Sequence, residues 1–375
     1  MNKRLAVLMG VSTLLVGAQA VSAQEVSPQA ITIQAEEAIF SDVAYDAAGG
    51  RLLVSSVSDG AVYAVDEEGN LTPVLESELV TSASGLAVDS ANNRLIVLSS
   101  GFGAMFGGGA GGFTPPEGFP TPDATMMAQG GQMPQPPADF QLPEGVSLPA
   151  SHVLAFDLET GASVYDVDLS GVAPTMGGLL GGVAVDASGS VYITDSLAAV
   201  VYRVDAAGAP TFLSDSQFGA QGPGISGIAV HPDGYLLVSK TLDGSLYRID
   251  LTTGAVQAVT ISDAPASLSD LTVLANGNVA ALNAADSSLI ILTSADGWLT
   301  ASVQTTLPLE AGGTALTANG NTLYVLQSGL PQGLPQGLPQ GLPQGLPQDA
   351  MPQPESTPDF ANLPPVTSTI LRFEF

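Results

Sequence analysis

Gly182-Val-Ala-Val-Asp186 and Gly227-Ile-Ala-Val-His231 are two copies of a short apolar phrase that recurs along the chain. Its other copies are Asp42-Val-Ala-Tyr-Asp46, Gly85-Leu-Ala-Val-Asp89, Asp270-Leu-Thr-Val-Leu274 and Gly313-Thr-Ala-Leu-Thr317. The third residues of successive copies are 43, 97, 45, 43 and 43 positions apart. A repeat of this length is typical of a β-propeller, in which each repeat forms one blade.

Each copy begins a series of strand patterns. Arg51–Ser56 and Ala61–Asp66 follow the first copy, and Tyr235–Lys240 and Ser245–Asp250 follow the fourth. Alternating apolar residues with turn residues between the runs predict antiparallel strands joined by hairpins. We therefore predict an all-β, six-bladed β-propeller with four antiparallel strands per blade. Residues 30–35 have strand character but no blade of their own, so this N-terminal strand is predicted to complete the last blade.

The composition excludes several kinds of function. The chain has 375 residues, with 36 acidic side chains, 8 Lys or Arg, 2 His and no Cys, and its formal net charge is −28. Without cysteine there is no disulfide framework, no thiolate metal site and no cysteine nucleophile. A charge this negative repels the phosphate backbone of nucleic acids and anionic lipid. We therefore expect no nucleic-acid partner.

The N-terminus carries the three-part pattern of a secretory signal. A short basic start and the apolar run 5–16 precede Val21-Ser22-Ala23, which ends in a small-residue cleavage site. We predict that residues 1–23 are a signal peptide and that residues 24–375 form a single propeller domain. The mature protein is expected to be secreted or periplasmic, monomeric and without a transmembrane segment.

Two low-complexity insertions interrupt the repeat. Residues 101–150 are rich in Gly and Pro and fall between the second and third strands of blade 2. Residues 329–366 begin with tandem Gly-Leu-Pro-Gln repeats and fall at the same place in blade 6. In an up-and-down blade this loop always opens on the same face. Both insertions are therefore predicted to lie on one face of the propeller.

Polar residues end the second strands on that same face. They are Ser56, Ser99, Asp195, Lys240, Asn283 and Gln327. Asp42 and Asp270 stand at the start of two first strands, also on this face. No catalytic residue is assigned. The candidate ligand-binding residues are Asp42, Asp195, Lys240, Asp270, Asn283 and Gln327.

Two interpretations of these side chains remain open. In the first they form a polar pocket, in which Asp42 and Asp270 are the candidates to hold a divalent cation. In the second, Asp195 pairs with Lys240 on the neighbouring blade, while Asp42 and Asp270 accept hydrogen bonds from local backbone N–H groups. We expect no cofactor, with a bound divalent cation as the alternative.

The phrase Gly182-Val-Ala-Val-Asp186, the strand Tyr192-Ile-Thr-Asp-Ser196 and the repeat length resemble NHL-type propellers and the gluconolactonase/regucalcin family. The resemblance implies a six-bladed propeller. In lactonase-type members it also implies a divalent metal held by Glu, Asn and Asp at the starts of blades. The matching positions in this chain are Ser41, Gly181, Ser226 and Ser269. The resemblance therefore carries over the scaffold without the metal-ligand residues, because hard cations require carboxylate oxygens.

Two functions follow as expectations. The first is a secreted, non-catalytic binding propeller that holds a protein, a peptide or a glycan on the face with the insertions. The alternative is a metal-dependent, lactonase-like hydrolase with a rebuilt acidic pocket made from Asp42, Asp195 and Asp270.

Overall fold

The computed structural model describes residues 28–35, 38–100, 150–173, 178–219, 224–328 and 366–375. Regular structure in this part of the chain is β-strand, apart from one 3₁₀ turn at Ser216–Phe218. No helix among these residues is long and apolar enough to cross a membrane. The predicted signal peptide (1–23) and all but the edges of the insertions (101–150 and 329–366) lie outside the described residues.

Four sheets of the described part have four antiparallel strands each. The first contains β2 (Phe40–Asp46), β3 (Arg51–Ser56), β4 (Val62–Val65) and β5 (Leu71–Leu75). The second contains β6 (Ala83–Asp89), β7 (Arg94–Ser99), β8 (His152–Asp157) and β9 (Ser163–Asp168). The third contains β10 (Leu180–Val185), β11 (Val191–Asp195), β12 (Val200–Val204) and β13 (Pro210–Ser214). The fourth contains β22 (Ala315–Asn319), β23 (Thr322–Gln327), β24 (Val366–Glu374) and β1 (Gln29–Ala35).

The remaining sheet has eight strands and consists of two consecutive antiparallel groups. One group contains β14 (Ile225–His231), β15 (Tyr235–Lys240), β16 (Leu246–Asp250) and β17 (Val256–Ser262). The other contains β18 (Asp270–Val273), β19 (Val279–Asn283), β20 (Ser288–Thr293) and β21 (Thr300–Pro308). Their outer strands β17 and β21 pair in parallel, with Thr260 opposite Thr300 and Ser262 opposite Ser302. The all-β, propeller-like arrangement is thus confirmed, whereas the prediction of six separate blades is confirmed only in part.

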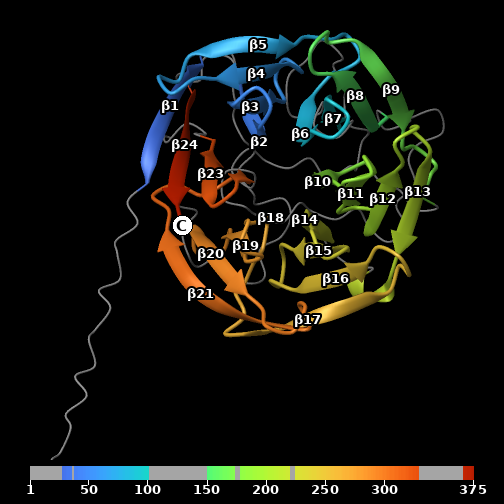
Figure 1. Ribbon diagram of the computed structural model, residues 1–375, viewed down its shortest axis with the longest axis vertical. Coiled ribbons are helices and arrows are strands. Elements are labelled where there is room, and N and C mark those ends of the chain that lie inside the picture. Colours follow the sequence, from blue (N-terminus) through green and yellow to red (C-terminus); the bar gives the residue numbers. More distant parts are fainter. Residues whose placement is uncertain (1–27, 36–37, 101–149, 174–177, 220–223, 329–365) are drawn as a thin grey trace, which may run out of the picture.

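The sheets stand around a common centre, as Figure 1 shows. The first strand of every group lies innermost, and contacts between these strands run from β2 through β6, β10, β14, β18 and β22 back to β2. The second strands β3, β7, β11, β15, β19 and β23 all end on one face of this ring, which we call the loop face. The first strands begin on the loop face as well, because each is antiparallel to its second strand.

The N-terminal strand closes the ring. β1 pairs antiparallel with β24 along its whole length, from Gln29 opposite Arg372 to Ala35 opposite Val366. It is the outermost strand of the sheet that ends the chain, which is the position predicted for residues 30–35. Ile33 of β1 is completely buried there.

A β-bulge near the start of the first strand recurs around the ring. The pairing shifts between Phe40 and Asp42 in β2, and at the corresponding places in β6, β10 and β14. A bulge bends the strand and frees backbone groups from the ladder. Neighbouring first strands approach closely at this point, since a Cβ on Gly182 would lie 3.0 Å from both the backbone nitrogen of Ile228 and the carbonyl oxygen of Ser226. A Cβ at Gly182 would therefore force the neighbouring first strand to shift by a few tenths of an ångström.

The last repeat has a different register from the one predicted. The spacing of the repeats aligned Gly313 with Asp42. In the structure Asp42 pairs with Ser55, the second-last residue of β3. The residue of β22 that pairs with the second-last residue of its own second strand, Leu326, is Ala315. The prediction was wrong by two residues, because Asp270 and Ala315 are 45 positions apart, whereas the alignment with Gly313 assumed a spacing of 43.

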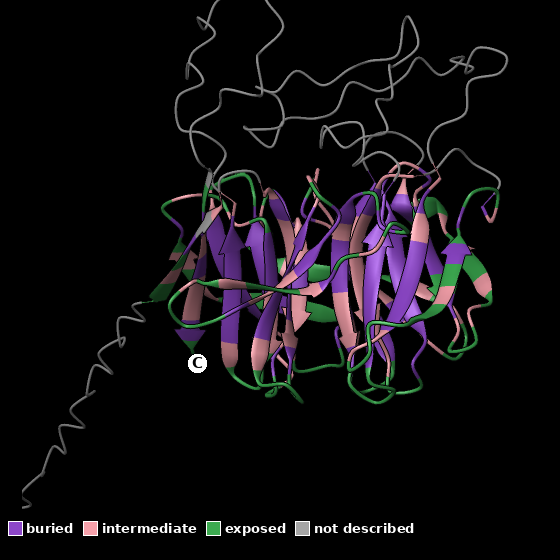
Figure 2. Cartoon of the chain, turned by 90° about the horizontal axis from the view of Figure 1, so that it is seen from above, coloured by how far each residue is buried: buried purple, intermediate pink, exposed green. Residues whose placement is uncertain are grey.

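Aliphatic side chains fill the seams between neighbouring sheets. Purple, buried residues occupy the middle of the strands in Figure 2, while green, exposed residues gather in the turns at the rims. Alternate residues of each second strand face opposite seams: Leu53 packs towards Leu86 of the next sheet, whereas Val54 packs towards Tyr324 of the preceding one. The same alternation decides where the polar side chains at the strand ends point.

Candidate functional site

The polar residues that end the second strands face the seams between sheets. Asp195, the last residue of β11, is completely buried. Its carboxylate accepts hydrogen bonds from the backbone N–H groups of Gly178 at 2.7 Å, Leu197 at 2.9 Å and Ala198 at 3.0 Å. Gly178 belongs to the connection that leads into the same sheet from the preceding one. Asp195 therefore fastens a loop to its own sheet.

Lys240 does not pair with Asp195, so this part of the second interpretation is wrong. Its ammonium group lies 3.2 Å from the carboxylate of Asp243 in the following turn. The side chain is 13% exposed and lies beside Gly219, on which a Cβ would approach its nitrogen to 3.1 Å. Alternation again explains the result, because Lys240 faces the seam with the preceding sheet and lies in a different seam from Asp195.

Asn283 and Gln327 are also used locally. The side-chain oxygen of Asn283 accepts the N–H of Ala285 at 3.3 Å. The Gln327 amide donates to the carbonyl of Ala311, in the connection that precedes its own sheet. Both residues are more than nine-tenths buried. The ring of polar residues predicted as a ligand-binding site thus holds connections and turns of the propeller in place.

Asp42 and Asp270 differ from these residues because they lie on innermost strands. Asp42 accepts the N–H of the next residue, Val43, at 2.8 Å through one oxygen, and the N–H of Leu86 in the next sheet at 2.7 Å through the other. Asp270 repeats this pattern, with distances of 2.8 Å to Leu271 and 2.9 Å to Leu316. Both carboxylates therefore cap backbone groups, as the second interpretation predicts. Each of them also joins two neighbouring first strands.

The two carboxylates act on one another electrostatically. Burial raises the pKa of Asp42 well above its ordinary value, and repulsion from the Asp270 carboxylate raises it further, although the N–H groups of Leu86 and Val43 oppose this. Burial likewise raises the pKa of Asp270 to about 7, against the hydrogen bonds from Leu316 and Leu271. Both side chains keep a partial opening to solvent, but protein atoms surround them closely enough for desolvation to dominate.

Burial also raises the pKa of Asp195, against its backbone hydrogen bonds. Of the three predicted carboxylates, Asp42 and Asp270 lie on innermost strands and repulsion from Asp270 acts on Asp42, whereas Asp195 is completely buried at the end of a second strand.

The residues do not fit the metal site of lactonase-type propellers. At the matching positions, the Ser41 hydroxyl donates to the carbonyl of Ala83 at 2.8 Å and the Ser226 hydroxyl donates to that of Ser269 at 2.9 Å. These hydroxyls bind neighbouring first strands together. Across the described residues, no group of three or more His, Cys, Asp or Glu side chains is placed to hold a metal ion.

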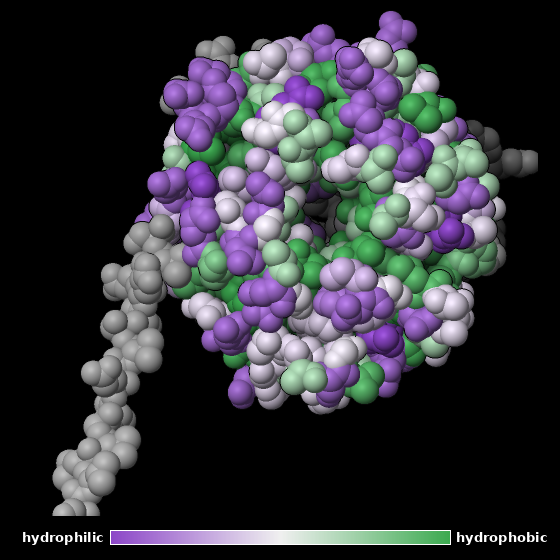
Figure 3. Space-filling model, in the orientation of Figure 1, coloured by the Kyte–Doolittle hydropathy of each residue, from purple (hydrophilic) through white to green (hydrophobic). Residues whose placement is uncertain are grey.

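The centre of the ring is open. Figure 3, drawn along the axis of the ring, shows a hollow bordered mainly by hydrophobic and neutral residues, with hydrophilic side chains further out.

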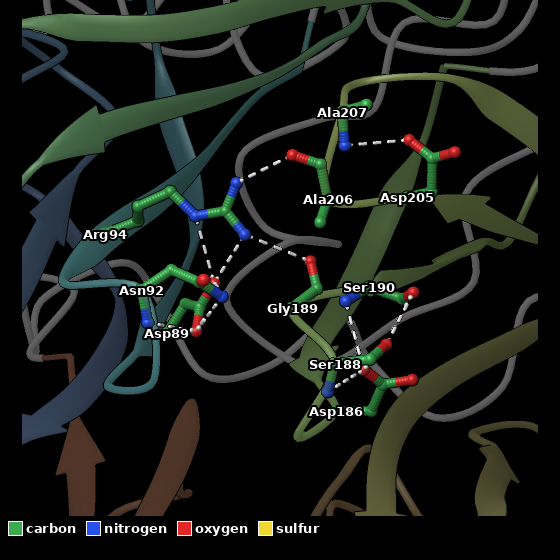
Figure 4. Close-up of polar contacts among 10 residues, drawn as sticks. All are labelled: Asp89, Asn92, Arg94, Asp186, Ser188, Gly189, Ser190, Asp205, Ala206 and Ala207. Carbon is green, nitrogen blue, oxygen red and sulfur yellow. Dashed lines mark hydrogen bonds and ion pairs between the residues drawn. The ribbon is translucent and has the colours of Figure 1, made fainter.

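A buried ionic network on the opposite face was missed in the sequence analysis. Arg94 at the start of β7 pairs with Asp89 at 2.6 Å and also donates to the carbonyls of Gly189 at 3.2 Å and Ala206 at 3.1 Å (Figure 4). The last two residues lie in turns of the next sheet, so the guanidinium ties two sheets together. The spacing of Asp89 and Arg94 repeats that of Asp46 and Arg51, and this repetition was the available signal.

Comparisons with known proteins agree with the fold. No protein-family model matches the chain, and no curated protein matches it in sequence. The major allergen Mala s 1 of Malassezia sympodialis matches with a TM-score of 0.58 at 18% identity, over 80% of this chain and 90% of that one. A gluconolactonase from Xanthomonas campestris matches with a TM-score of 0.50 at 16% identity, over 80% and 86%. A candidate gluconolactonase matches with a TM-score of 0.50 at 17% identity, over 79% and 88%. These likenesses support a gluconolactonase-like propeller fold, and at such identities they concern the fold alone.

Proposed function

We propose that this protein is a secreted, non-catalytic binding propeller that holds a cationic protein or peptide on its loop face. One observation carries the proposal: all six candidate side chains make their polar contacts within the propeller itself. Asp195, Asn283 and Gln327 hold turns and connections, and Asp42 and Asp270 join first strands. Side chains engaged in this way have a structural role, so we propose that the loops on this face bind the partner.

The six-bladed arrangement is part of this proposal. The eight-stranded sheet divides into two antiparallel groups of four, each with its own first strand in the ring. At their outer edges the two groups are joined by three residue pairs of β17 and β21. We therefore interpret these groups as two blades whose outermost strands are paired with one another, which gives a rigid platform of six blades.

The charge of the surface supports a cationic partner. Acidic side chains outnumber Lys and Arg by 36 to 8. Among the described residues, four of the basic side chains are in ion pairs with carboxylates: Arg51, Arg94, Lys240 and Arg372. Arg203 donates to the Ser190 hydroxyl, and Arg248 stacks on the ring of Tyr235. The uncompensated charge is thus carboxylate, which attracts cations and accelerates their association.

Titration calorimetry of the mature chain with an oligolysine peptide tests the proposal. We expect saturable binding that weakens as salt is added, and no binding of a neutral peptide of equal length. Two matched variants locate the surface. Glu76→Gln/Glu78→Gln/Glu310→Gln removes three exposed charges next to the loop face, and Glu67→Gln/Glu68→Gln/Glu159→Gln removes three on the opposite face. Only the first should lower the affinity, by about tenfold. Equal losses, or none, would contradict binding at the loop face.

The lactonase-like alternative is tested with the same protein. It requires metal-dependent hydrolysis of a lactone, a rise in melting temperature with the metal, and loss of both effects in Asp42→Asn. The binding propeller predicts that lactone hydrolysis stays at the spontaneous rate with Ca²⁺, Mn²⁺ or Zn²⁺. Metal-dependent turnover would replace the present proposal with the alternative.

A further inference from the structure

Two tyrosines stack on one another where the ring of sheets closes. Tyr45 lies on β2 in the first sheet, and Tyr324 lies on β23 in the sheet that ends the chain. Their ring centroids are 5.7 Å apart, and the planes of the rings are inclined by only 5°. Stacked carbon atoms touch at about 3.5–4.0 Å, so rings with this separation are offset and meet along their edges.

The hydroxyl groups of this pair differ from those of the other tyrosines. Neither has a hydrogen-bond partner in the described part of the chain, and neither is enclosed by protein, so both reach the surface. The hydroxyls of the other six tyrosines are bonded or buried: those of Tyr63, Tyr192, Tyr202 and Tyr247 bind Asp59, Asp186, Asp195 and the carbonyl of Gln217, and those of Tyr165 and Tyr235 are buried. Hydrogen bonding within the chain therefore does not explain the hydroxyls of Tyr45 and Tyr324.

Packing holds the two rings in place. Tyr324 is 7% exposed and belongs to the buried cluster that contains Phe40 and Leu326, and Tyr45 packs against the same cluster. Burial raises the pKa of Tyr324, the charge of Arg372 opposes this, and the phenol of Tyr45 raises it further. Because that repulsion acts between the oxygen atoms, the two hydroxyl ends lie near one another.

The pair bridges the seam on which closure of the ring depends. The first sheet meets the last one through contacts of β2 with β22 and β23 (Figure 1). Most of the chain separates Tyr45 from Tyr324 in sequence, and without cysteine no disulfide can fasten this seam. A covalent bond between the two rings would restrict the unfolded chain strongly, because a cross-link costs the unfolded state more entropy when the loop it closes is longer.

We propose that Tyr45 and Tyr324 form a dityrosine cross-link when a one-electron oxidant reaches their hydroxyls. Each phenol gives up one electron to the oxidant and one proton to water. The two phenoxyl rings then form a bond between a Cε carbon of each. The hydrogens on those carbons move to the phenol oxygens, so the product has two hydrogens fewer than the starting chain. This modification site is independent of the binding function proposed for the loop face.

Photo-oxidation of the dilute mature chain tests the proposal. Light-excited ruthenium tris-bipyridyl withdraws the electrons, and persulfate accepts them and becomes sulfate. We expect a monomeric product that has lost two hydrogens, shows dityrosine fluorescence and yields one linked pair of peptides containing residues 45 and 324. Its melting temperature should exceed that of the untreated chain by about 5–10 °C.

Phenylalanine variants identify the residues that react. Tyr45→Phe and Tyr324→Phe keep the stacked rings and should fold like the unchanged chain, but neither should form the intramolecular link. Tyr63→Phe and Tyr192→Phe are the matched controls and should form it fully. The inference is overturned if the monomer does not lose two hydrogens, if the link joins other tyrosines, if Tyr45→Phe or Tyr324→Phe still forms it, or if the linked chain melts like the untreated one.

Discussion

Asp42 and Asp270 occupy the same register position in two different sheets, and each carboxylate accepts an N–H from the first strand of the following sheet. The donors are Leu86, at 2.7 Å, and Leu316, at 2.9 Å. Each aspartate thus joins two first strands through one side-chain oxygen. The energetic cost of these two carboxylates is electrostatic, because burial raises the pKa of both and repulsion from Asp270 raises the pKa of Asp42 further.

Stability should therefore fall as the pH rises from about 4 to about 7. The ordinary pKa of 3.8 applies to Asp270 in the unfolded chain, and burial raises the folded value to about 7. Below pH 3.8 the Asp270 carboxyl group is protonated in both the folded and the unfolded state, and its contribution to stability is fully present. Between the two values only the unfolded state ionises, so the contribution is progressively lost. Urea unfolding at about pH 5 and about pH 8 should show the higher midpoint at the lower pH.

Asp270→Asn should reduce this difference, because the amide does not ionise. Asp296→Asn is the control, since hydrogen bonds from Thr300 lower the pKa of that exposed carboxyl group and place its titration below the tested range. The control should keep the full difference between the two midpoints. An Asp270→Asn protein with the pH dependence of the unchanged chain would exclude the buried pair as its source.

Arg94→Met should lower the free energy of unfolding by about 3–5 kcal/mol, because it leaves the buried carboxylate of Asp89 without its cation. The two side chains are only 7% and 1% exposed. Arg51→Met is the matched control: Arg51 and Asp46 have the same spacing, but Arg51 is 35% exposed. Asp46 is itself only 4% exposed but keeps hydrogen bonds from the N–H groups of Ala48 and Gly49, so the loss of Arg51 should cost less, about 1–2 kcal/mol. Denaturant unfolding of both variants measures the difference, and equal costs would show that burial of the network is not what makes it stabilising.

Gly227→Ala should destabilise the ring where two first strands meet. The added Cβ would lie 2.8 Å from the Cα atom of Asp270 and 2.6 Å from the Ser239 hydroxyl, and the backbone atom cannot move aside cheaply. We expect a loss of about 1–3 kcal/mol in the free energy of unfolding. Gly312→Ala is the control, because its nearest neighbour would be the Ser287 hydroxyl at 3.8 Å. That substitution should be neutral or raise the melting temperature slightly, and a greater loss there than at Gly227 would contradict the close packing.

The strands and their circular order could be predicted from the repeated pattern of apolar residues. Each sheet packs against two neighbouring sheets, so its strands need apolar side chains on both faces. The same logic identified residues 30–35 as a closing strand, which β1 confirms. The parallel pairing of β17 and β21 could not be predicted, since it depends on how far two outer strands lean together. The register of the last repeat was predicted wrongly because Gly313 resembles the glycines that begin the other copies. In the structure, Ala315 holds the equivalent position in β22.

The candidate site was predicted less well, for a geometric reason. Strand register correctly placed Asp195 and Lys240 at the ends of second strands. It does not reveal the distance across a seam, and in the structure Lys240 reaches Asp243 instead. The capping role of Asp42 and Asp270 was predictable from local chemistry. Their bonds to Leu86 and Leu316 in the next sheet were not, because the alternation of residues does not give the distance between the first strands of neighbouring sheets.

Removal of residues 103–148 should leave the propeller folded. Ser99 and His152 are paired opposite one another in β7 and β8, so the chain leaves the sheet and returns to it at adjacent positions. The deletion leaves a short hairpin loop, and the smaller loop-closure entropy favours folding by about 2 kcal/mol at most. Thermal unfolding should show a melting temperature equal to that of the full chain or a few degrees higher. A large decrease would mean that the deleted segment contributes to the core.

Ile33→Ala should show whether β1 is an integral part of the ring. Ile33 is completely buried in the seam that also contains Phe40 and Leu326, so the substitution leaves a cavity and should cost about 2–5 kcal/mol. Because β1 closes the sheet of β22 to β24, the loss should appear in the single cooperative transition measured by circular dichroism. Thr32→Ala, at the exposed neighbouring position, should change stability by less than about 0.5 kcal/mol. If Ile33→Ala left the global transition unchanged while β1 became sensitive to protease, β1 would be a peripheral strand, and the contacts of β22 and β23 with β2 would keep the ring closed.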